Sequence, residues 1–140
     1  MEIMGFIILP HTADLRMRVD GLSLQELFLG AFEGMMRVLK ERKPSREAAK
    51  IFKRRIKISS ADASALLVDF LNEVLYNAYS HKEIYLSVAF KNISNTELEA
   101  EIFGVPVEDF DEDIKATTYH EADIKKNKSG KWETVLVFDI

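Results

Sequence analysis

Hydrophobic residues follow two different periods along this chain, and each period predicts one kind of secondary structure. Where apolar and polar residues alternate, the pattern is typical of a strand with one buried face. The segments that share this alternation are 14–20, 51–58, 84–90, 98–102, 117–124 and 132–140. A further strand is expected before residue 10. The tetrapeptides 93–96 and 127–130 carry turn residues, so the segments around each are expected to pair as hairpins.

Two segments instead show the spacing of helices. Ser23 is followed three residues later by Glu26, which is the pattern of a capping box. Apolar residues then recur at helical spacing from Leu24 to Val38, before a polar stretch that contains proline. Asp62 is positioned to cap a second helix, in which apolar doublets repeat every four residues. This broad apolar stripe indicates a central helix.

The order of these elements is β-β-α-β-α-β-β-β-β, which predicts an α+β fold. We expect a single two-layer domain over residues 1–140, with two helices packed on a mainly antiparallel or mixed β-sheet. The composition is that of a globular protein that folds without covalent cross-links, because 47% of the 140 residues are hydrophobic and 30% are charged.

Composition also excludes several classes of chemistry. The chain has no cysteine, so disulfides, zinc-thiolate sites, iron-sulfur clusters and thiol catalysis are absent. The net charge of −4 opposes broad binding to nucleic acid, which depends on neutralising phosphates. Contact with RNA is therefore expected to be indirect or local at most. No apolar run approaches a membrane span and no signal-like segment opens the chain, so we expect a cytoplasmic protein that does not bind membranes.

The densest basic segment runs from Lys50 to Lys57. Its alternating side chains indicate a strand with a charged outer face, on which Arg54 is an exception because it falls on the apolar side. Such a face could contact a phosphate backbone, contact an acidic protein or simply be solvated.

Candidate metal chemistry begins at His11-Thr12-Ala13-Asp14, where a segment ended by proline enters a strand. This motif is compatible with a metal site, an acid–base pair or a polar turn. The apolar C-terminal segment ends in Asp139, directly before Ile140 and its terminal carboxylate. If this segment pairs with the strand that follows Asp14, the converging oxygens would suit Ca²⁺, Mg²⁺ or Mn²⁺.

Other acidic and histidine residues give weaker patterns. The run 108–113 has alternating acidic residues, but a calcium loop that starts at Asp109 would need glycine and glutamate where Ile114 and His120 stand. His81 and His120 have no ligand spacing to another histidine. The glycine-rich motifs that hold nucleotide phosphates and the elbow of serine hydrolases are absent from the sequence.

Five segments together resemble the archease family in order and spacing, and the resemblance covers nearly the whole chain. These segments are His11–Asp14, Gly21–Phe28, Leu66–Tyr76, Ile114–His120 and Phe138–Ile140.

The resemblance implies a non-catalytic accessory protein of an RtcB-type RNA ligase, an enzyme that joins RNA ends in tRNA splicing or RNA repair with GTP and Mn²⁺. It implies that the accessory protein promotes guanylylation of the ligase and allows multiple turnover. By matching motifs, Asp14 and Asp139 would be side-chain ligands of a divalent metal, Ile140 would contribute terminal or carbonyl oxygens, and His11 would support the site. Calcium is the ion expected first, with manganese or magnesium as alternatives.

Two other functions remain open at this stage. The family has also been described as chaperone-like, so the chain could be an adaptor for RNA-modifying enzymes. A small metal-dependent hydrolase that uses Asp14, Asp139 and His11 is less well supported, because the sequence shows neither an activated nucleophile nor a phosphate clamp.

Overall fold

The computed structural model describes residues 5–9, 14–45 and 50–140. Its elements, in chain order, are β1 Phe6–Leu9, β2 Leu15–Gly21, α1 Leu24–Leu39, β3 Phe52–Ser59, α2 Ala63–His81, β4 Glu83–Ile93, β5 Glu97–Pro106, β6 Ala116–Thr118, β7 Lys125–Lys126 and β8 Trp132–Asp139.

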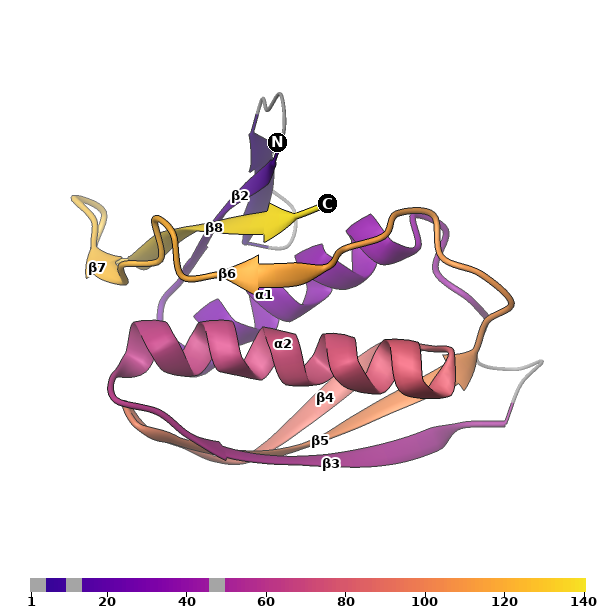
Figure 1. The fold of residues 1–140 in the computed structure, drawn as a ribbon. Coiled ribbons are helices and arrows are strands. Elements are labelled where there is room, and N and C mark those ends of the chain that lie inside the picture. The colour runs from indigo at the N-terminus through magenta and orange to yellow at the C-terminus, as the bar shows by residue number, and fades with distance from the viewer. Residues whose placement is uncertain (1–4, 10–13, 46–49) are drawn as a thin grey trace.

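The strands form two sheets, and the two helices lie between them (Figure 1). Sheet A has the strand order β1-β2-β8-β6, with β7 pairing β8 beside β6, and sheet B has the order β3-β5-β4. Every strand pair among the described residues is antiparallel. The predicted α+β class and the antiparallel pairing are therefore confirmed. The structure differs from the expected single sheet, because dividing the strands between two sheets places the helices in a middle layer.

Both helices begin where the capping residues predict. The Ser23 side chain accepts a hydrogen bond from the Glu26 amide at 3.1 Å, and Asp62 accepts one from the Ala65 amide at 2.8 Å. The helix α2 ends at His81, after which Lys82 adopts a left-handed backbone conformation with φ of 54°. Within the described residues, neither helix combines the length and hydrophobicity needed to cross a membrane.

The helices meet through aromatic rings in the core. Phe70 of α2 stacks on Phe28 and Phe32 of α1, with ring centroids 5.9 and 6.4 Å apart, and it also contacts Phe90 of β4 at 5.7 Å. On the other side of α1, Gly34 allows a close approach to sheet A. A Cβ atom at this position would lie 2.4 Å from the Met17 sulfur and 2.9 Å from the Phe6 ring, so a larger residue would force these side chains or the helix to shift.

The segment 117–124 is not the single strand that its pattern predicted. Only its first two residues belong to a strand, β6, which is followed by a turn around residues 119–122. The two-residue β7 begins just after the segment, at Lys125, and both strands pair with β8. The predicted turn after β7 is present, since the Asn127 amide donates to the Lys131 carbonyl at 2.7 Å. The Asn127 side chain also accepts hydrogen bonds from the amides of Ser129 and Lys131, which closes this turn.

The exceptional Arg54 on the apolar side of β3 is explained by a buried ion pair. Its guanidinium donates two hydrogen bonds to the Glu83 carboxylate, at 3.0 and 2.7 Å, and the Glu83 side chain is only 3% exposed. The Tyr85 hydroxyl donates to the same carboxylate at 3.0 Å. Burial acts to raise the pKa of Glu83, but the hydrogen bonds from Arg54 and Tyr85 outweigh it and hold this pKa below its ordinary value.

The predicted basic outer face of β3 lies beside carboxylates on the neighbouring strand. Arg55 is opposite Glu101 and Lys57 is opposite Glu99 in the antiparallel register with β5. Lys53 also lies 3.4 Å from the Glu101 carboxylate. The outer face of sheet B therefore carries interspersed charges of both signs, which reduces its attraction for a phosphate backbone.

Replacing Arg54 should expose the cost of a buried, unpaired carboxylate. We expect Arg54→Met to lower the free energy of unfolding at pH 7 by about 3–5 kcal/mol, because Glu83 remains charged and buried without its partner. The exposed neighbour provides the matched control, and Arg55→Met should change stability by less than about 1 kcal/mol. Urea denaturation of the three proteins measures both effects.

The pH dependence of the same variants gives a second check. The lowered pKa of Glu83 in the native protein stabilises the fold above the ordinary value of about 4.3, and this contribution is lost as pH falls through the folded-state pKa. In Arg54→Met, burial should instead raise the pKa of Glu83. Protonation of Glu83 as pH falls then removes the buried charge and reduces the destabilisation of the variant. The stability difference should therefore narrow between pH 7 and about pH 4.5, and a constant difference over this range would contradict the assignment.

Candidate functional site

The two aspartates singled out in the sequence lie opposite each other at one end of sheet A. Leu15 of β2 is opposite Phe138 of β8, and the same register extended by one residue places Asp14 opposite Asp139. Asp14 itself lies in a bend directly before β2, so the two aspartates adjoin the last residue pair of this ladder at the same end of the sheet. The pairing on which the predicted metal site depends is therefore present. His11 lies outside the described residues.

Both aspartates belong to the solvent side of sheet A. Leu15 and Phe138 are buried on the inner side against the helices, so by strand alternation their neighbours face outward. Asp14 and Asp139 are exposed, whereas Ile140 is half-buried and packs against the edge of the core. Like charges directly opposite each other on a sheet are unfavourable, so this end of the sheet attracts cations.

The chain terminus is held in place by Lys115. The Lys115 amide donates to the Asp139 carbonyl at 2.7 Å, and its side-chain ammonium lies 3.3 Å from the Ile140 carbonyl oxygen. The last two residues are therefore ordered by contacts to the segment that precedes β6. The ammonium group of Lys115 therefore lies next to the Ile140 oxygen that is predicted to act as a metal ligand.

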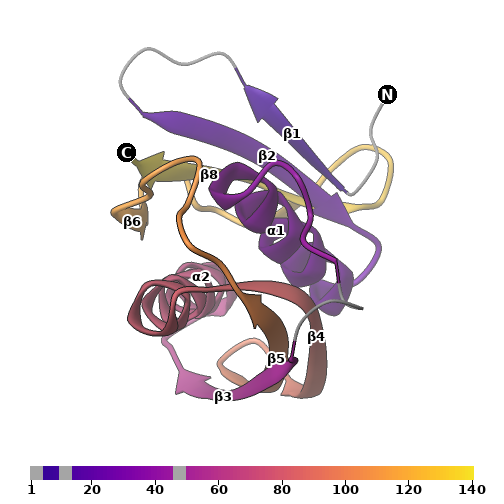
Figure 2. The same cartoon turned by 90° about the vertical axis from the view of Figure 1, so that its right-hand side faces the viewer.

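Side chains of α2 hold the outer edge of sheet A. The Asn72 amide nitrogen donates to the Thr117 carbonyl at 2.9 Å, and the Asn72 oxygen accepts from the Thr117 amide at 2.7 Å. The Tyr79 hydroxyl both donates to the Ile114 carbonyl and accepts from the Ile114 amide, each at 2.8 Å. Asn72 therefore pairs with β6 in the way that a neighbouring strand would, and it covers an edge that would otherwise be open. Figure 2 shows β6 between α2 and β8, near the end of the chain.

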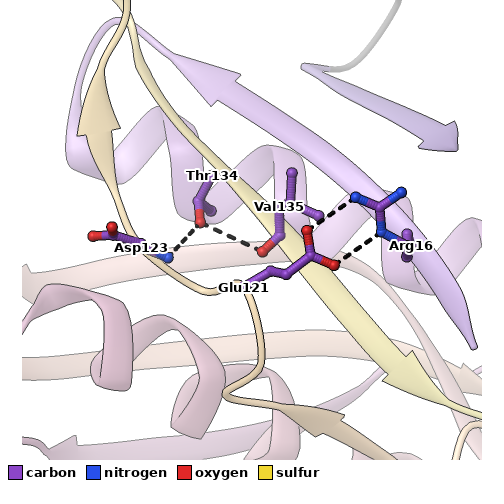
Figure 3. Close-up of polar contacts among 5 residues, drawn as sticks. All are labelled: Arg16, Glu121, Asp123, Thr134 and Val135. Carbon is purple, nitrogen blue, oxygen red and sulfur yellow. Dashed lines mark hydrogen bonds and ion pairs between the residues drawn. The ribbon is translucent and has the colours of Figure 1, made fainter.

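An ion pair crosses the outer face beside the aspartates. Arg16 on β2 donates two hydrogen bonds to Glu121, at 3.0 and 2.9 Å, and Glu121 reaches it from the turn after β6 (Figure 3). Hydrogen bonds from Arg16 hold the pKa of Glu121 below its ordinary value. Val137 of β8 lies opposite both Arg16 and Thr118, and it is only 3% exposed although it points outward. The ion pair therefore helps to cover the apolar centre of this face.

Further hydrogen bonds fix the turn from which Glu121 extends. The Thr134 hydroxyl accepts from the Asp123 amide at 2.9 Å and donates to the Val135 carbonyl at 3.4 Å (Figure 3). The Ile124 amide donates to the Ser64 hydroxyl of α2 at 3.0 Å. These contacts tie the connection between β6 and β7 to both β8 and α2.

The donor set at Asp14, Asp139 and Ile140 consists of oxygens alone, which suits a hard divalent cation. No group of three or more histidine, cysteine, aspartate or glutamate side chains with metal-binding geometry occurs among the described residues. Three protein ligands at this site therefore require an oxygen of the chain terminus in addition to the two aspartates. The residues fit such an ion, and its binding remains a prediction.

The sequence did not reveal several residues that build this region. Asn72 interrupts the apolar pattern of α2, and this polar residue beside an apolar stripe was the available signal of a structural contact. No pattern indicated that Lys115 contacts the terminus or that Glu121 pairs with Arg16, because these pairs join segments far apart in the sequence.

Comparison with known proteins gives matches over almost the whole chain. The family model described as "Archease protein family (MTH1598/TM1083)" matches residues 6–140. A protein named archease from Methanosarcina acetivorans is 31% identical over 141 residues, covering 94% of this chain and 93% of the relative. Another from Thermococcus gammatolerans is 33% identical over 144 residues, covering 93% and 94%.

Two solved structures share the fold. The solution structure of protein 1598 from Methanobacterium thermoautotrophicum aligns with a TM-score of 0.74 at 23% identity, covering 99% of this chain and 100% of that one. A crystal structure from Thermotoga maritima, titled as an archease and possible chaperone, aligns with a TM-score of 0.63 at 20% identity and 94% coverage of both chains.

Removing the Asn72 side chain should loosen the edge of sheet A. We expect Asn72→Ala to lower the free energy of unfolding by about 1–3 kcal/mol, because an amide and a carbonyl of Thr117 lose their partners. The Thr117 amide should also exchange with solvent deuterium faster than in the native protein. Ser80→Ala, at an exposed position of the same helix, is the control and should change stability by less than about 0.5 kcal/mol. Equal Thr117 exchange in Asn72→Ala and the native protein would contradict the role given to Asn72.

Proposed function

The chain belongs to the archease family, and on that premise we propose that it is a non-catalytic, metal-binding activator of an RtcB-type RNA ligase. In this role it promotes guanylylation of the ligase and multiple turnover during tRNA splicing or RNA repair in the cytoplasm. The observation that carries the proposal is the convergence of Asp14, Asp139 and the chain terminus at one end of sheet A.

The two carboxylates at this end make no contact that stabilises the described part of the fold. Within the part of the chain that the structure describes, neither the Asp14 nor the Asp139 side chain makes a hydrogen bond or ion pair, and both are exposed. Two opposed carboxylates beside a terminal carboxylate cost electrostatic free energy in the absence of a cation. Such a group is explained more simply by a ligand than by stability.

The proposed ion would be held by Asp14, Asp139 and an oxygen of Ile140, with His11 as a supporting residue. Calcium is our first choice, and manganese or magnesium are alternatives, because all of them prefer oxygen ligands. When bound, such an ion supplies a positive charge that can polarise or attract phosphate oxygens. The chain itself contributes the carboxylates, the ordered terminus and the exposed position that lets a partner protein reach the site.

A chaperone-like adaptor for RNA-modifying enzymes is the second candidate. It is favoured by the Thermotoga maritima archease, which has been described as a possible chaperone. The two functions differ in one measurement. An activator accelerates ligation by purified ligase at limiting enzyme concentration, whereas an adaptor for other enzymes leaves the ligation rate unchanged.

Replacing either aspartate should abolish activation and leave the fold intact. We expect Asp14→Ala and Asp139→Ala to weaken calcium binding by more than about 10-fold and to lose stimulation of ligation, because each removes a charged ligand. Their unfolding temperatures in the absence of metal should equal or exceed that of the native protein, since the variants relieve repulsion between like charges. Asp123→Ala, an exposed aspartate distant from the site, is the control and should activate normally. Normal stimulation by both site variants would reject a functional metal.

Extending the chain beyond Ile140 should also weaken metal binding. A short glycine-serine tag converts the terminal carboxylate into a neutral amide, which lowers the charge of the ligand set. The same tag at the N-terminus is the control, because β1 begins opposite Val19, roughly 16 Å along β2 from Asp14. Calcium titration and ligation assays on untagged, N-tagged and C-tagged protein measure the effect. Indistinguishable behaviour of all three proteins would remove the terminus from the mechanism.

A further inference from the structure

Two exposed tyrosines lie on the solvent side of α2 and beside it. The Tyr76 residue is 66% exposed and Tyr119 is 60% exposed, and among the described residues no other aromatic residue is comparably accessible. Exposed tyrosines are enriched where proteins bind one another, because a large, stiff ring offers contact area at a low entropic cost. Neither ring has a role in the proposed metal site, so both require a separate explanation.

Contacts between α2 and the segment 114–119 place Tyr76 close to the chain terminus. Asp69, Asn72 and Tyr79 bind Tyr119, Thr117 and Ile114 respectively, so this segment runs antiparallel to the helix. With rises of about 1.5 Å per residue in the helix and about 3.3 Å in the extended segment, Tyr76 lies alongside Lys115. Lys115 in turn contacts Ile140.

The Tyr119 ring is exposed but fixed. Its hydroxyl donates to the Asp69 carboxylate, and the other oxygen of this carboxylate accepts a hydrogen bond from Ser60 at 2.5 Å. The hydrogen bond to Asp69 raises the pKa of Tyr119 above its ordinary value. A ring that is already held in place loses little freedom on binding, which favours its use as an anchor residue.

The segments beside the two rings carry more carboxylates than cations. Glu73, which is half-buried, lies one helical turn from both Asp69 and Tyr76 on α2. Glu112 and Asp113, beyond Tyr79, lie close enough to this residue to raise the pKa of its hydroxyl, although burial is the larger cause. Together with Asp139 and the terminal carboxylate, these carboxylates give the face a negative charge that the single ammonium group of Lys115 does not balance. An RNA strand would be repelled by this face, whereas arginine and lysine side chains of a protein would be attracted to it.

We infer that the tyrosine face, formed by Tyr76, Tyr119, Asp69 and Glu73, docks on a basic surface of the ligase. This inference rests on the proposed function and adds to it the face that binds and the chemistry of its partner surface. Arginine side chains can stack on the exposed rings and also pair with the carboxylates. A standard interface covers about 800 Å² on each partner, which is wide enough to include both the tyrosine face and the nearby aspartates. Docking by this face therefore presents the metal site to the ligase.

Binding of the purified ligase to full-length variants tests the inference, with calcium titration of each variant in parallel. We expect Tyr76→Ala and Tyr119→Ala to weaken ligase binding by 10-fold or more while calcium affinity changes by less than about 2-fold. Tyr119→Phe keeps the ring but loses its anchor on Asp69, so its loss should be intermediate. Binding by the native protein should also weaken as salt concentration increases.

Leu22→Ala is the matched control. Leu22 is as exposed as Tyr76, at 66%, and it lies beyond Gly21, which is roughly 23 Å along β2 from Asp14. This variant should bind the ligase normally. Tight, unchanged ligase binding by both Tyr76→Ala and Tyr119→Ala would overturn the tyrosine face while leaving metal-dependent activation in place. If the native protein neither binds nor activates the ligase, the proposed function fails and this inference fails with it.

Discussion

The central position of β8 in sheet A determines the arrangement of the candidate site. The last strand of a chain often lies at an edge, where its end can fray, but β8 pairs with β2 on one side and with β6 and β7 on the other. Because both sides of β8 are hydrogen-bonded, the strand continues to Asp139, the residue before the last. The register with β2 then brings Asp139 and Asp14 to the same end of the sheet, so one strand pairing fixes both the fold and the position of the candidate ligands.

The helix α2 maintains this arrangement from the opposite side of β6. A three-residue strand has little stability of its own, and β6 would present an open edge to solvent. The side chain of Asn72 pairs with the backbone of Thr117, and Tyr79 does the same for Ile114. The helix is in turn packed on sheet B through its apolar stripe. Sheet B carries none of the residues proposed to bind the metal. It contributes to the site by supporting the helix that holds β6.

The sequence predicted those features that depend on neighbouring residues. Ser23 and Asp62 cap the helices as expected, and the alternating segments form strands in nearly all cases. The division of the strands between two sheets was not predicted, because alternation shows which side of a strand is buried but not which strand lies beside it. The prediction of a single strand over residues 117–124 was wrong for a related reason. Contacts of Glu121 and Asp123 with distant strands stabilise a turn in this segment. The local pattern of apolar and polar residues does not predict such long-range contacts.

The same limit applied to the candidate site. The sequence could state only that Asp14 and Asp139 would converge if their strands paired, and the long-range register supplies that pairing. A comparison with Glu83 shows why the aspartates differ from a structural carboxylate. Glu83 is buried, and within the chain it receives hydrogen bonds from Arg54 and Tyr85, so its charge is already satisfied. Asp14 and Asp139 are exposed, where water limits the cost of their repulsion and the fold can tolerate them without a partner. Stability therefore requires no cation at this end of sheet A, and the two carboxylates remain available to a ligand from outside the chain.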